Sequence, residues 1–333
     1  MILLNDKSVY VLEQYDIEVK KILKGRGALI IDTDKGFFRF FEYKGTLSRL
    51  IYEEELLNYI SDCGFSNVNS IIKNKEDVLF SVDTAGIKYV LTKHFNGSEC
   101  DVRNRHDLIQ AVETLARLHN ITSHAKLDNT EYIPELSDSL EEITKHNTEL
   151  KRIRSYIRGK TRKTDFEYDI LAHFSQFYEL AQNAQQELFA SGCKEAHRQA
   201  VSSHSICHGN YSYHNIIHCQ ENGMAIINFE HSGRGMLIRD LYFFLRKVME
   251  KHDWNQTLGL ELLESYDKIR TLSEQERKIL KILLSYPEKF WKVLNHYYNG
   301  NKAYLPDQMK DKMQKVYIQQ KNKSKFVASK NLF

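Results

Sequence analysis

Hydrophobic and polar positions along the first hundred residues alternate in short runs, which predicts a small antiparallel sheet. Glycine-containing turns separate the runs, as expected for strands joined by tight connections. Between the second and third runs, residues 47–63 carry apolar side chains at helical spacing and stop at Gly64, so one helix is expected there. The predicted strands are residues 28–32, 37–41, 78–82 and 89–93.

Beyond residue 97 the spacing of apolar positions becomes helical. Residues 107–120 form a clear amphipathic pattern, and the other expected helices are 138–158, 164–190, 239–251, 256–269, 273–285, 287–299 and 307–321. Strand-like runs interrupt them at 206–207, 216–217 and 225–227. We therefore predict a two-lobed α+β fold. A β-rich N-terminal lobe at 1–97 precedes a large, mostly helical C-terminal lobe at 98–333 with a β insert.

The composition excludes several classes of protein. Only 15 of the 333 residues are glycine and 3 are proline, which excludes collagen-like and low-complexity chains. The five cysteines are odd in number and widely spaced, so no disulfide framework is expected, and Cys63, Cys100 and Cys193 should be isolated buried thiols. There is no apolar run of about 18 residues and no signal-like start, so we predict synthesis in the cytosol without a membrane span.

Charge and aromatic residues leave two interpretations open. The net charge of +3 does not by itself indicate a nucleic-acid partner. Residues 151–163 nevertheless hold seven Lys or Arg and no acid, and residues 302–333 hold eight Lys and two Asp. Both runs are typical of a solvated surface, and contact with a polyanion or a partner is the alternative. Packing or a protein interface would each explain an aromatic stripe at Tyr286, Phe290, Trp291, Tyr297 and Tyr298.

Candidate chemistry is concentrated in residues 205–241. An apolar strand leads into His208-Gly209-Asn210, Asn215 follows after four residues, and two short strands end at Asn228-Phe229-Glu230. Phosphoryl transfer to a hydroxyl uses a carboxylate that orients the hydroxyl, an asparagine about five residues later that binds a metal, and a carboxylate after the next hairpin. The spacing fits that plan. A zinc site built from Cys207, His208, His214, His218 and Cys219 is disfavoured, because strand alternation would scatter these side chains.

The loop resembles that of the aminoglycoside phosphotransferase and choline kinase-like fold, H-G-D-x-x-x-x-N followed by D-x-D. The preceding segment L-A-R-L-H at 115–119 is also similar to that family. The stretches at 41–50, 239–251, 254–259 and 286–299 resemble the CotS family of bacterial spore coat proteins, and the resemblance covers roughly residues 8–328. It implies a protein kinase-like fold, a place in the spore coat of endospores, and other coat proteins as partners.

The same resemblance identifies where this chain departs from an active kinase. Asn210 stands at the position of the loop aspartate and Asn228 at that of a metal-binding aspartate. An amide takes no proton near neutral pH and is a weaker magnesium ligand than a carboxylate. Phe41 stands where a β-strand lysine would bind phosphates, and we expect its ring to fill the adenine side of the cleft. The phosphate-cradling glycines are reduced to Gly25 and Gly27, for which a plain turn is the alternative.

The remaining candidates have structural alternatives. His208 is expected to be a buried histidine bonded to backbone, Asp240 an N-cap or an anchor of its loop, and Asn215 either a metal ligand or a cap of its own turn. Asn215, Asn228 and Glu230 form a degenerate metal site.

These departures favour a pseudokinase that serves as a scaffold in coat assembly, with no cofactor required. The alternatives are an active phosphotransferase with a rearranged site that uses ATP and magnesium, and a polyanion binder. A nucleic-acid partner is not expected.

Overall fold

The computed structural model describes residues 10–127, 131–219, 223–300 and 306–329. The chain forms two compact units, which are described separately. The first contains Met1–Pro134 and Ile206–Arg234, and the second contains Glu135–Ser205 and Gly235–Phe333. The loop at 206–230 therefore belongs to the same unit as the N-terminal sheet. The predicted lobe boundary at residue 97 stays a prediction.

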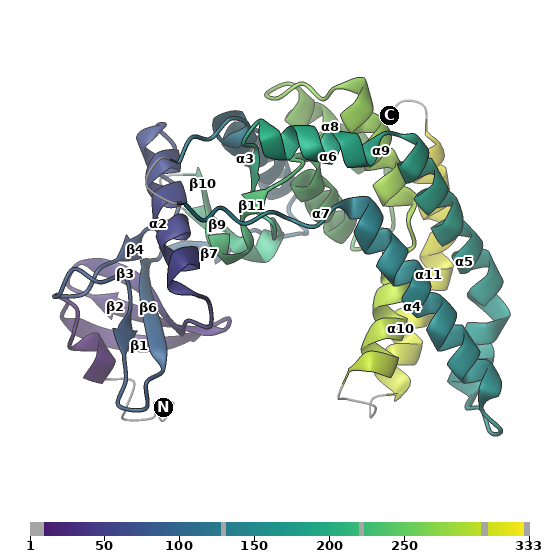
Figure 1. Cartoon of the computed structure of the whole chain (residues 1–333), viewed down its shortest axis with the longest axis horizontal. Helices are drawn as coiled ribbons and strands as arrows, with labels where there is room; N and C mark the ends of the chain where they lie inside the picture. Colours follow the sequence, from purple (N-terminus) through teal and green to yellow (C-terminus); the bar gives the residue numbers. More distant parts are fainter. Residues whose placement is uncertain (1–9, 128–130, 220–222, 301–305, 330–333) are drawn as a thin grey trace. The chain divides into compact units, whose positions relative to one another are not determined.

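Antiparallel strands in the order β1-β2-β3-β6-β4 form the sheet of the first unit, and β5 also pairs with β6 (Figure 1). Its two faces carry different clusters, because side chains alternate along a strand. Phe38 and Phe40 join one cluster, whereas Phe41 packs on the other with Tyr43 and Val90. The strands are β1 Val19–Gly25, β2 Ala28–Thr33, β3 Gly36–Glu42, β4 Ile71–Ile72, β5 Ser81–Val82 and β6 Lys88–Lys93.

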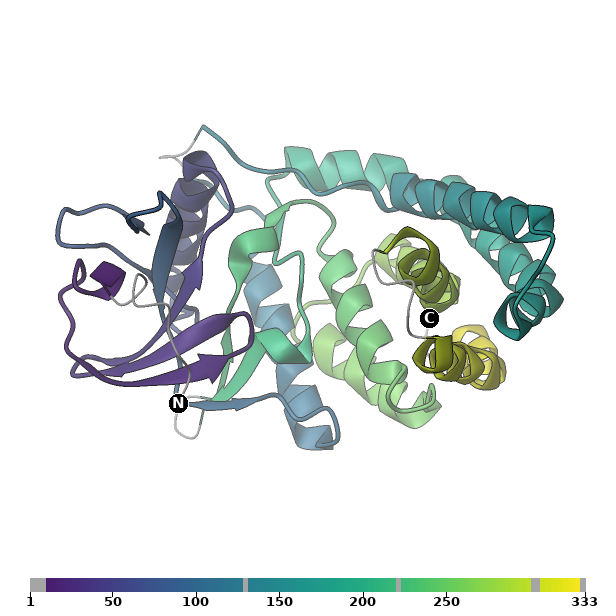
Figure 2. The same cartoon turned by 90° about the horizontal axis from the view of Figure 1, so that it is seen from below.

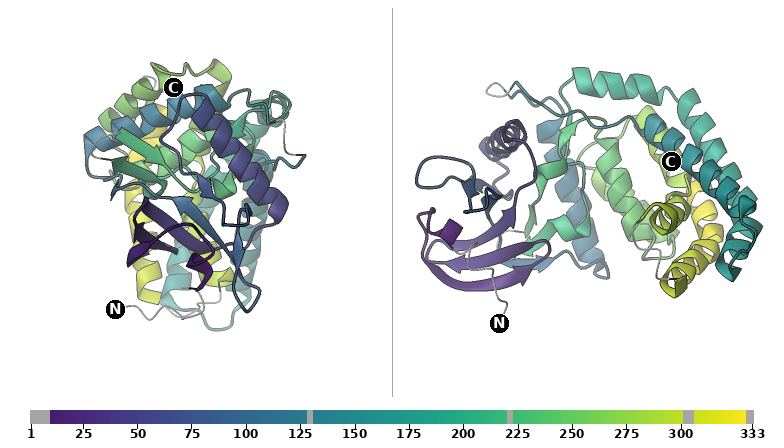
Figure 3. Two further views of the ribbon diagram at one scale, coloured as in Figure 1. Left: turned by 90° about the vertical axis from the view of Figure 1, so that its left-hand side faces the viewer. Right: turned by 60° about the horizontal axis from the view of Figure 1, so that its bottom comes forward.

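A single helix, α2 (Leu47–Asp62), covers the Phe41 face of this sheet and is seen nearly end-on in the right panel of Figure 3. The helix begins where the Thr46 side chain accepts a hydrogen bond from the Arg49 backbone, which satisfies one of the unpaired amides of the first turn. Leu50 is the helix residue in the cluster with Tyr43 and Val90. Burial of these apolar side chains holds the helix on the sheet.

The rest of the first unit surrounds helix α3 (Arg105–Thr122). A second sheet has the order β10-β9-β7, and a two-stranded ladder pairs β11 with β8. The Tyr211 hydroxyl donates a 2.7 Å hydrogen bond to the Ala111 carbonyl, which ties the loop after β8 to α3. The elements are β7 Gly97–Glu99, β8 Ile206–Cys207, β9 Ile216–Cys219, β10 Gly223–Ile226, β11 Gly233–Arg234, and the 3-10 turns η1 Tyr213–Asn215 and η2 Phe229–His231.

The regular elements of the second unit, over its described part, are mainly helices. Helices α4 and α5 form an antiparallel pair, and α10 runs beside α4 (Figures 1 and 2). Helix α5 starts with a reciprocal cap in which the Thr164 hydroxyl accepts from the Glu167 amide and the Glu167 carboxylate accepts from the Thr164 amide. The helices are α4 Ser139–Gly159, α5 Asp165–Ala190, α6 Cys193–Ser202, α7 Ile238–Met249, α8 Gln256–Asp267, α9 Glu274–Ser285, α10 Glu288–Asn299 and α11 Pro306–Ala328.

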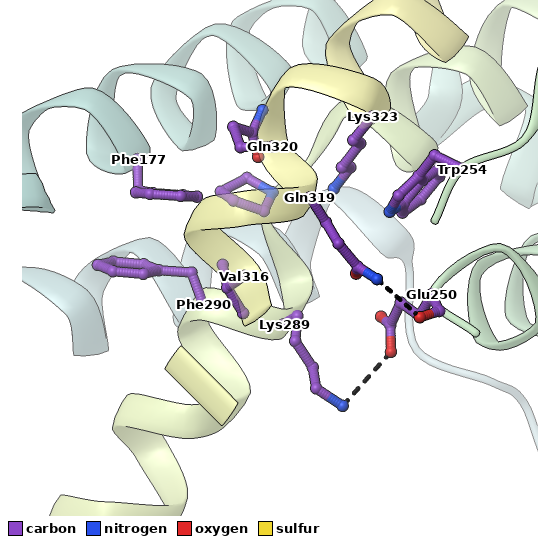
Figure 4. A pocket seen from close by; sticks show the side chains of 10 residues that line it. Phe177, Glu250, Trp254, Lys289, Phe290, Val316, Gln319, Gln320 and Lys323 are labelled. Carbon is purple, nitrogen blue, oxygen red and sulfur yellow. Dashed lines mark hydrogen bonds and ion pairs between the residues drawn. The ribbon is translucent and has the colours of Figure 1, made fainter. Parts of the chain in front are cut away.

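A buried lysine anchors α11 inside this unit. Lys323 donates a 2.6 Å hydrogen bond to the Tyr286 carbonyl, and its ammonium lies 5.1 Å from the Trp254 ring centroid (Figure 4). Lys289 pairs with Glu250 at 3.4 Å across the same space. The cavity between these side chains has a volume of about 30 Å³, which is room for about one water molecule rather than for a ligand.

The α+β class predicted from the sequence is confirmed, with a small antiparallel sheet and a larger set of helices. Several local elements were not predicted, namely strands β1, β4, β7 and β11 and helix α6, and the predicted strand at 78–82 is reduced to β5. The prediction for Cys63 was wrong, since it is exposed rather than buried, whereas Cys100 and Cys193 are buried as expected. Among the described helices, none is long and apolar enough to span a membrane.

Candidate functional site

The turn after β8 places a buried histidine with both ring nitrogens in use. His208 is 1% exposed, its Nδ1 accepts from the Asn210 amide at 3.2 Å, and its Nε2 donates to the Ile227 carbonyl at 3.0 Å. Since Nδ1 accepts, this arrangement requires the neutral imidazole with its proton on Nε2. The ring therefore links the turn to the segment that follows β10.

Gly209 is the one position of this turn that cannot carry a side chain. Its φ is +78°, and a Cβ built there would lie 2.0 Å from the His231 carbonyl oxygen. Glycine alone adopts this conformation without strain and permits so close an approach. The turn thus brings the Gly209 backbone against His231, in the segment that contains Asn228 and Glu230.

Asparagine side chains connect the three loop positions in a chain of hydrogen bonds. The Asn228 amide nitrogen donates to Asn215 Oδ1 at 2.7 Å, and the Asn215 amide nitrogen donates to the Asn210 carbonyl at 2.9 Å. Asn228 has φ +67°, a left-handed conformation that asparagine tolerates. Asn215 thus caps its own turn. Asn228 Oδ1 is buried and has no hydrogen-bond partner among the described residues.

Glu230 lies on η2, and only its backbone is tightly held. Arg49 of α2 donates to the Glu230 and Ser232 carbonyls, each at 2.6 Å, and its Nε lies 3.4 Å from a Glu53 carboxylate oxygen. The Glu230 side chain itself is exposed and lies 3.7 Å from His231 Nε2. Arg49 therefore fixes the loop to α2 while it leaves the Glu230 carboxylate accessible.

The strand position of the expected lysine is apolar, but a cation stands two residues before it. Phe41 packs on the cluster beneath α2, and the Arg39 guanidinium lies 4.2 Å from its ring centroid. Burial lowers the pKa of Arg39, although the negative charges of Glu230 and Glu53 oppose this shift. Arg39 has no ion pair within 4.0 Å among the described residues.

Sequence reasoning missed Arg39 because it considered only the position aligned with the family lysine. Residues two apart on a strand share a face, so a search of positions 39 and 43 as well would have found this cation. Glu53 was also missed. It is 7% exposed, and burial, reinforced by the charge of Glu230, raises its pKa to about 7 despite the nearby Arg49.

The glycine pair lies at the tip of the hairpin between β1 and β2. Gly25 pairs with Ala28, and Gly27 has φ +64°, as a tight two-residue turn requires. Arg26 between them holds Glu99 at 3.0 and 3.3 Å, and Glu99 also contacts His214 Nδ1 at 2.6 Å. Burial would raise the pKa of Glu99, but these two partners hold it below its usual value.

The first unit thus brings together His208, Asn210, Asn215 and Asn228, with Glu230 in the adjoining turn. Asp240 belongs to the second unit, where it is fully buried as the third residue of α7. It does not cap that helix, since Leu237 occupies the N-cap position, so this part of the prediction was wrong.

The donors in the loop fit a divalent cation poorly. Glu230 supplies an exposed carboxylate, whereas Asn215 Oδ1 accepts a hydrogen bond and Asn228 Oδ1 is buried. Magnesium favours carboxylates and phosphates in octahedral geometry. Over the described residues, no group of three His, Cys, Asp or Glu side chains is arranged to hold a metal ion.

Comparison with known families and structures agrees with this architecture. The family model described as "Spore coat putative kinase YutH" matches residues 8–330, as the resemblance to CotS-type coat proteins predicted. A search of the curated proteins gives no match.

Solved structures with a similar fold include phosphotransferases. An aminoglycoside phosphotransferase from Alicyclobacillus acidocaldarius subsp. acidocaldarius DSM 446 has a TM-score of 0.84 and 17% identity, with 96% of this chain and 94% of that chain covered. Amicoumacin kinase hAmiN, in complex with AMP-PNP and Ca²⁺, has a TM-score of 0.61 and 13% identity, with coverage of 97% and 94%. Choline kinase from Cryptosporidium parvum Iowa II has a TM-score of 0.51 and 14% identity, with 98% of each chain covered. The predicted protein kinase-like fold is confirmed.

Proposed function

Because this chain belongs to the "Spore coat putative kinase YutH" family, we propose that it is a kinase-shaped component of the spore coat that does not transfer phosphate. It would be synthesised in the cytosol, join the coat during endospore formation, and act through contacts with other coat proteins. Location in the spore coat and lack of phosphoryl transfer are two separate parts of this proposal.

The absence of a general base is the first argument for inactivity. Asn210 stands at the position from which a carboxylate would orient and deprotonate the attacking hydroxyl, and an amide accepts no proton near neutral pH. His208 offers no replacement. It is buried, and both of its nitrogens are engaged with backbone groups, so it has no free basic atom to present to a substrate.

The hydrogen bonds from Asn228 to Asn215 and from Asn215 to Asn210 are the observation that carries the proposal. An amide both donates and accepts, whereas a carboxylate only accepts. A carboxylate at position 228 would have no hydrogen to donate to Asn215 Oδ1, and the two oxygens would need a cation between them. Asparagine side chains hold the loop together by themselves, so its folded shape does not depend on a bound metal.

Coat assembly in a spore-forming host tests the proposal. We expect spores that carry the Asn210→Ala variant in place of the wild-type chain to have an unchanged coat, because the backbone of Asn210, not its side chain, makes the hydrogen bonds to His208 and Asn215. Gly209→Ala, which breaks the turn, serves as the control that should impair assembly. A coat defect in Asn210→Ala spores, with normal levels of folded protein, would contradict a non-catalytic role.

Nucleotide binding without turnover is a second candidate function. One observation favours it, the Arg39 guanidinium without an ion pair among the described residues. The phosphate oxygens of a bound nucleotide would pair with Arg39. This contact requires no general base.

Thermal unfolding with ATP and Mg²⁺ separates binding from its absence. Binding stabilises the folded chain by RT ln(1 + [L]/Kd), so a ligand at a hundred times its Kd contributes about 2.7 kcal/mol. Arg39→Gln should abolish this gain, while Lys44→Gln, an exposed cation three residues past Phe41, should leave it unchanged. No shift of the wild-type transition at millimolar ATP would refute this second function and leave the first intact.

A further inference from the structure

The second unit contains a pocket that the kinase-like loop does not use. It has a volume of about 550 Å³, within the range of natural ligand sites, and it lies where α4 and α10 end and α5 begins. Its walls combine the two features that the sequence left unexplained. Arg152, Tyr156 and Lys160 come from the basic run, and Tyr297 and Tyr298 come from the aromatic stripe.

The tyrosines form a fixed aromatic wall. The rings of Tyr156 and Tyr298 meet edge-to-face with centroids 5.7 Å apart, and Tyr297 and Tyr298 do so at 4.8 Å. Phe166 supports Tyr297 from behind at 5.1 Å. Tyr156 remains 60% exposed, so it offers most of its surface to a partner. Rigid aromatic side chains of this kind give contact area at a low cost in conformational entropy.

The one acidic side chain in the wall is fully used within the protein. Glu167 accepts from Lys160 Nζ at 2.6 Å, from the Thr164 amide at 2.9 Å and from the Tyr298 hydroxyl at 3.2 Å. These contacts outweigh the effect of burial and keep the pKa of Glu167 below its usual value. Arg152 is exposed and has no ion pair within 4.0 Å in the described part of the chain. The pocket therefore presents uncompensated positive charge.

Helix capping does not explain the whole basic run. Cations stabilise a helix C-terminus only within its last turn, which for α4 contains Arg158. Arg152 lies about two turns before Gly159, and Arg154 lies against the Phe174 ring at 5.0 Å. Within the described residues, Lys160 is the one cation of residues 151–163 that has an ion pair. The remaining charge is available for a partner of opposite sign.

We propose that this pocket docks an acidic segment of a protein partner, with an aromatic side chain of that segment seated against Tyr156 and Tyr298. Arginine and tyrosine are the residues that most often dominate protein interfaces, and positive potential steers an acidic partner to the site. The inference rests on the proposed role in coat contacts but uses none of the kinase-like loop residues.

The geometry favours a protein over a nucleic acid. Single-stranded nucleic acids bind along a basic groove in which successive bases stack on open aromatic faces. Here the rings are packed edge against face in one pocket, so each ring partly covers its neighbour and no row of parallel faces is available. A single aromatic anchor with acidic residues beside it matches this arrangement better.

Fluorescence anisotropy with defined polymers tests the proposal on the full chain. The probes are a random Glu/Tyr copolymer, polyglutamate of equal length, and a single-stranded oligonucleotide of equal charge, all without nucleotide. We expect the copolymer to bind at least tenfold more tightly than the other two. Tyr156→Ala and Arg152→Glu should each weaken copolymer binding by about tenfold or more.

Matched controls keep the result interpretable. Tyr168→Ala removes a tyrosine that is also 60% exposed but does not line the pocket, and Lys312→Glu reverses an exposed charge on α11, so both should bind like the wild type. Equal affinity for polyglutamate, tightest binding of the oligonucleotide, or insensitivity to Tyr156→Ala would overturn the proposal. None of these outcomes bears on phosphoryl transfer, so the two proposals fail independently.

Discussion

Asparagine at position 228 gives the kinase-like loop a hydrogen bond that aspartate would not provide. The Asn228 amide nitrogen donates to Asn215 Oδ1, whereas the buried Oδ1 of Asn228 has no hydrogen-bond partner among the described residues. At the scale of single residues, the difference between an amide and a carboxylate therefore decides whether this loop is stable alone or only around a cation.

Asn228→Asp should make the loop dependent on a divalent cation. The substitution replaces the donated hydrogen bond with two oxygens that face each other, which should cost about 1–3 kcal/mol of unfolding free energy. Urea unfolding with and without about 10 mM Mg²⁺ measures the effect, because this concentration suffices for a weak carboxylate site. We expect Mg²⁺ to restore the variant and to leave the wild type unchanged. A variant as stable as the wild type without Mg²⁺ would contradict this account of the loop.

Glu53 makes the stability of the chain depend on pH. Its pKa is about 7 in the folded protein, raised from 4.5 chiefly by burial, so between pH 4.5 and 7 the folded state binds more protons than the unfolded state. The free energy of unfolding should therefore fall as pH rises through this window. Relative to Glu53→Gln, the wild type should lose about 3 kcal/mol between pH 4.5 and 8. A pH-independent difference in chemical denaturation would show that Glu53 does not titrate in this range.

At the scale of elements, the sequence predicted best the helices with long periodic patterns. α2, α3, α4, α5 and α7 to α11 all lie where apolar spacing indicated them. Strand β1 was missed because Val19–Gly25 carries three lysines, which suit an exposed edge strand but hide its alternation. α6 is only ten residues long and follows Gly192 without a side-chain cap, so it gave no boundary signal.

The candidate site was predictable in position but not in its contacts. Spacing together with the family resemblance identified Asn210, Asn215 and Asn228, because the loop is short and its strands are adjacent in sequence. The hold of Arg49 on the Glu230 carbonyl joins segments far apart in the chain. The hydrogen bonds among the asparagines and the contact of Arg39 with the Phe41 ring join residues close in sequence, but they depend on side-chain conformations. Such contacts leave no periodic signal in a sequence.

Lys323 of helix α11 should make the folded chain more stable at alkaline pH. Burial lowers the pKa of Lys323 to about 8, against the attraction of Glu250, so between pH 8 and 10.5 the unfolded state binds more protons than the folded state. The free energy of unfolding should rise with pH in this window, by up to about 3 kcal/mol relative to Lys323→Met. Denaturant titrations of both proteins at pH 8 and pH 10 measure it. A constant difference would mean that Lys323 keeps an ordinary pKa.

At the scale of the whole molecule, a kinase-like fold is combined with a loop that carries few charges. By the resemblance to the kinase family, Asn210 and Asn228 stand where carboxylates are expected, and Phe41 stands where a lysine is expected. Phosphoryl transfer depends almost entirely on such charges for positioning and electrostatic stabilisation. Conserving the fold without them is consistent with a protein that acts by its surfaces. On this account, function depends more on partner binding at the tyrosine-lined pocket of the second unit than on the kinase-like loop.

Phosphate release from ATP is the measurement that tests this account most directly. The wild-type full chain is compared with the Asn210→Asp, Asn228→Asp double variant, each at a concentration equal to that of ATP and with Mg²⁺ present. Each protein is tested with small hydroxylated acceptors and with coat protein extracts. We predict no release or transfer by the wild type above a buffer blank. Mg²⁺-dependent transfer by the wild type that Asn210→Ala abolishes would contradict the central claim.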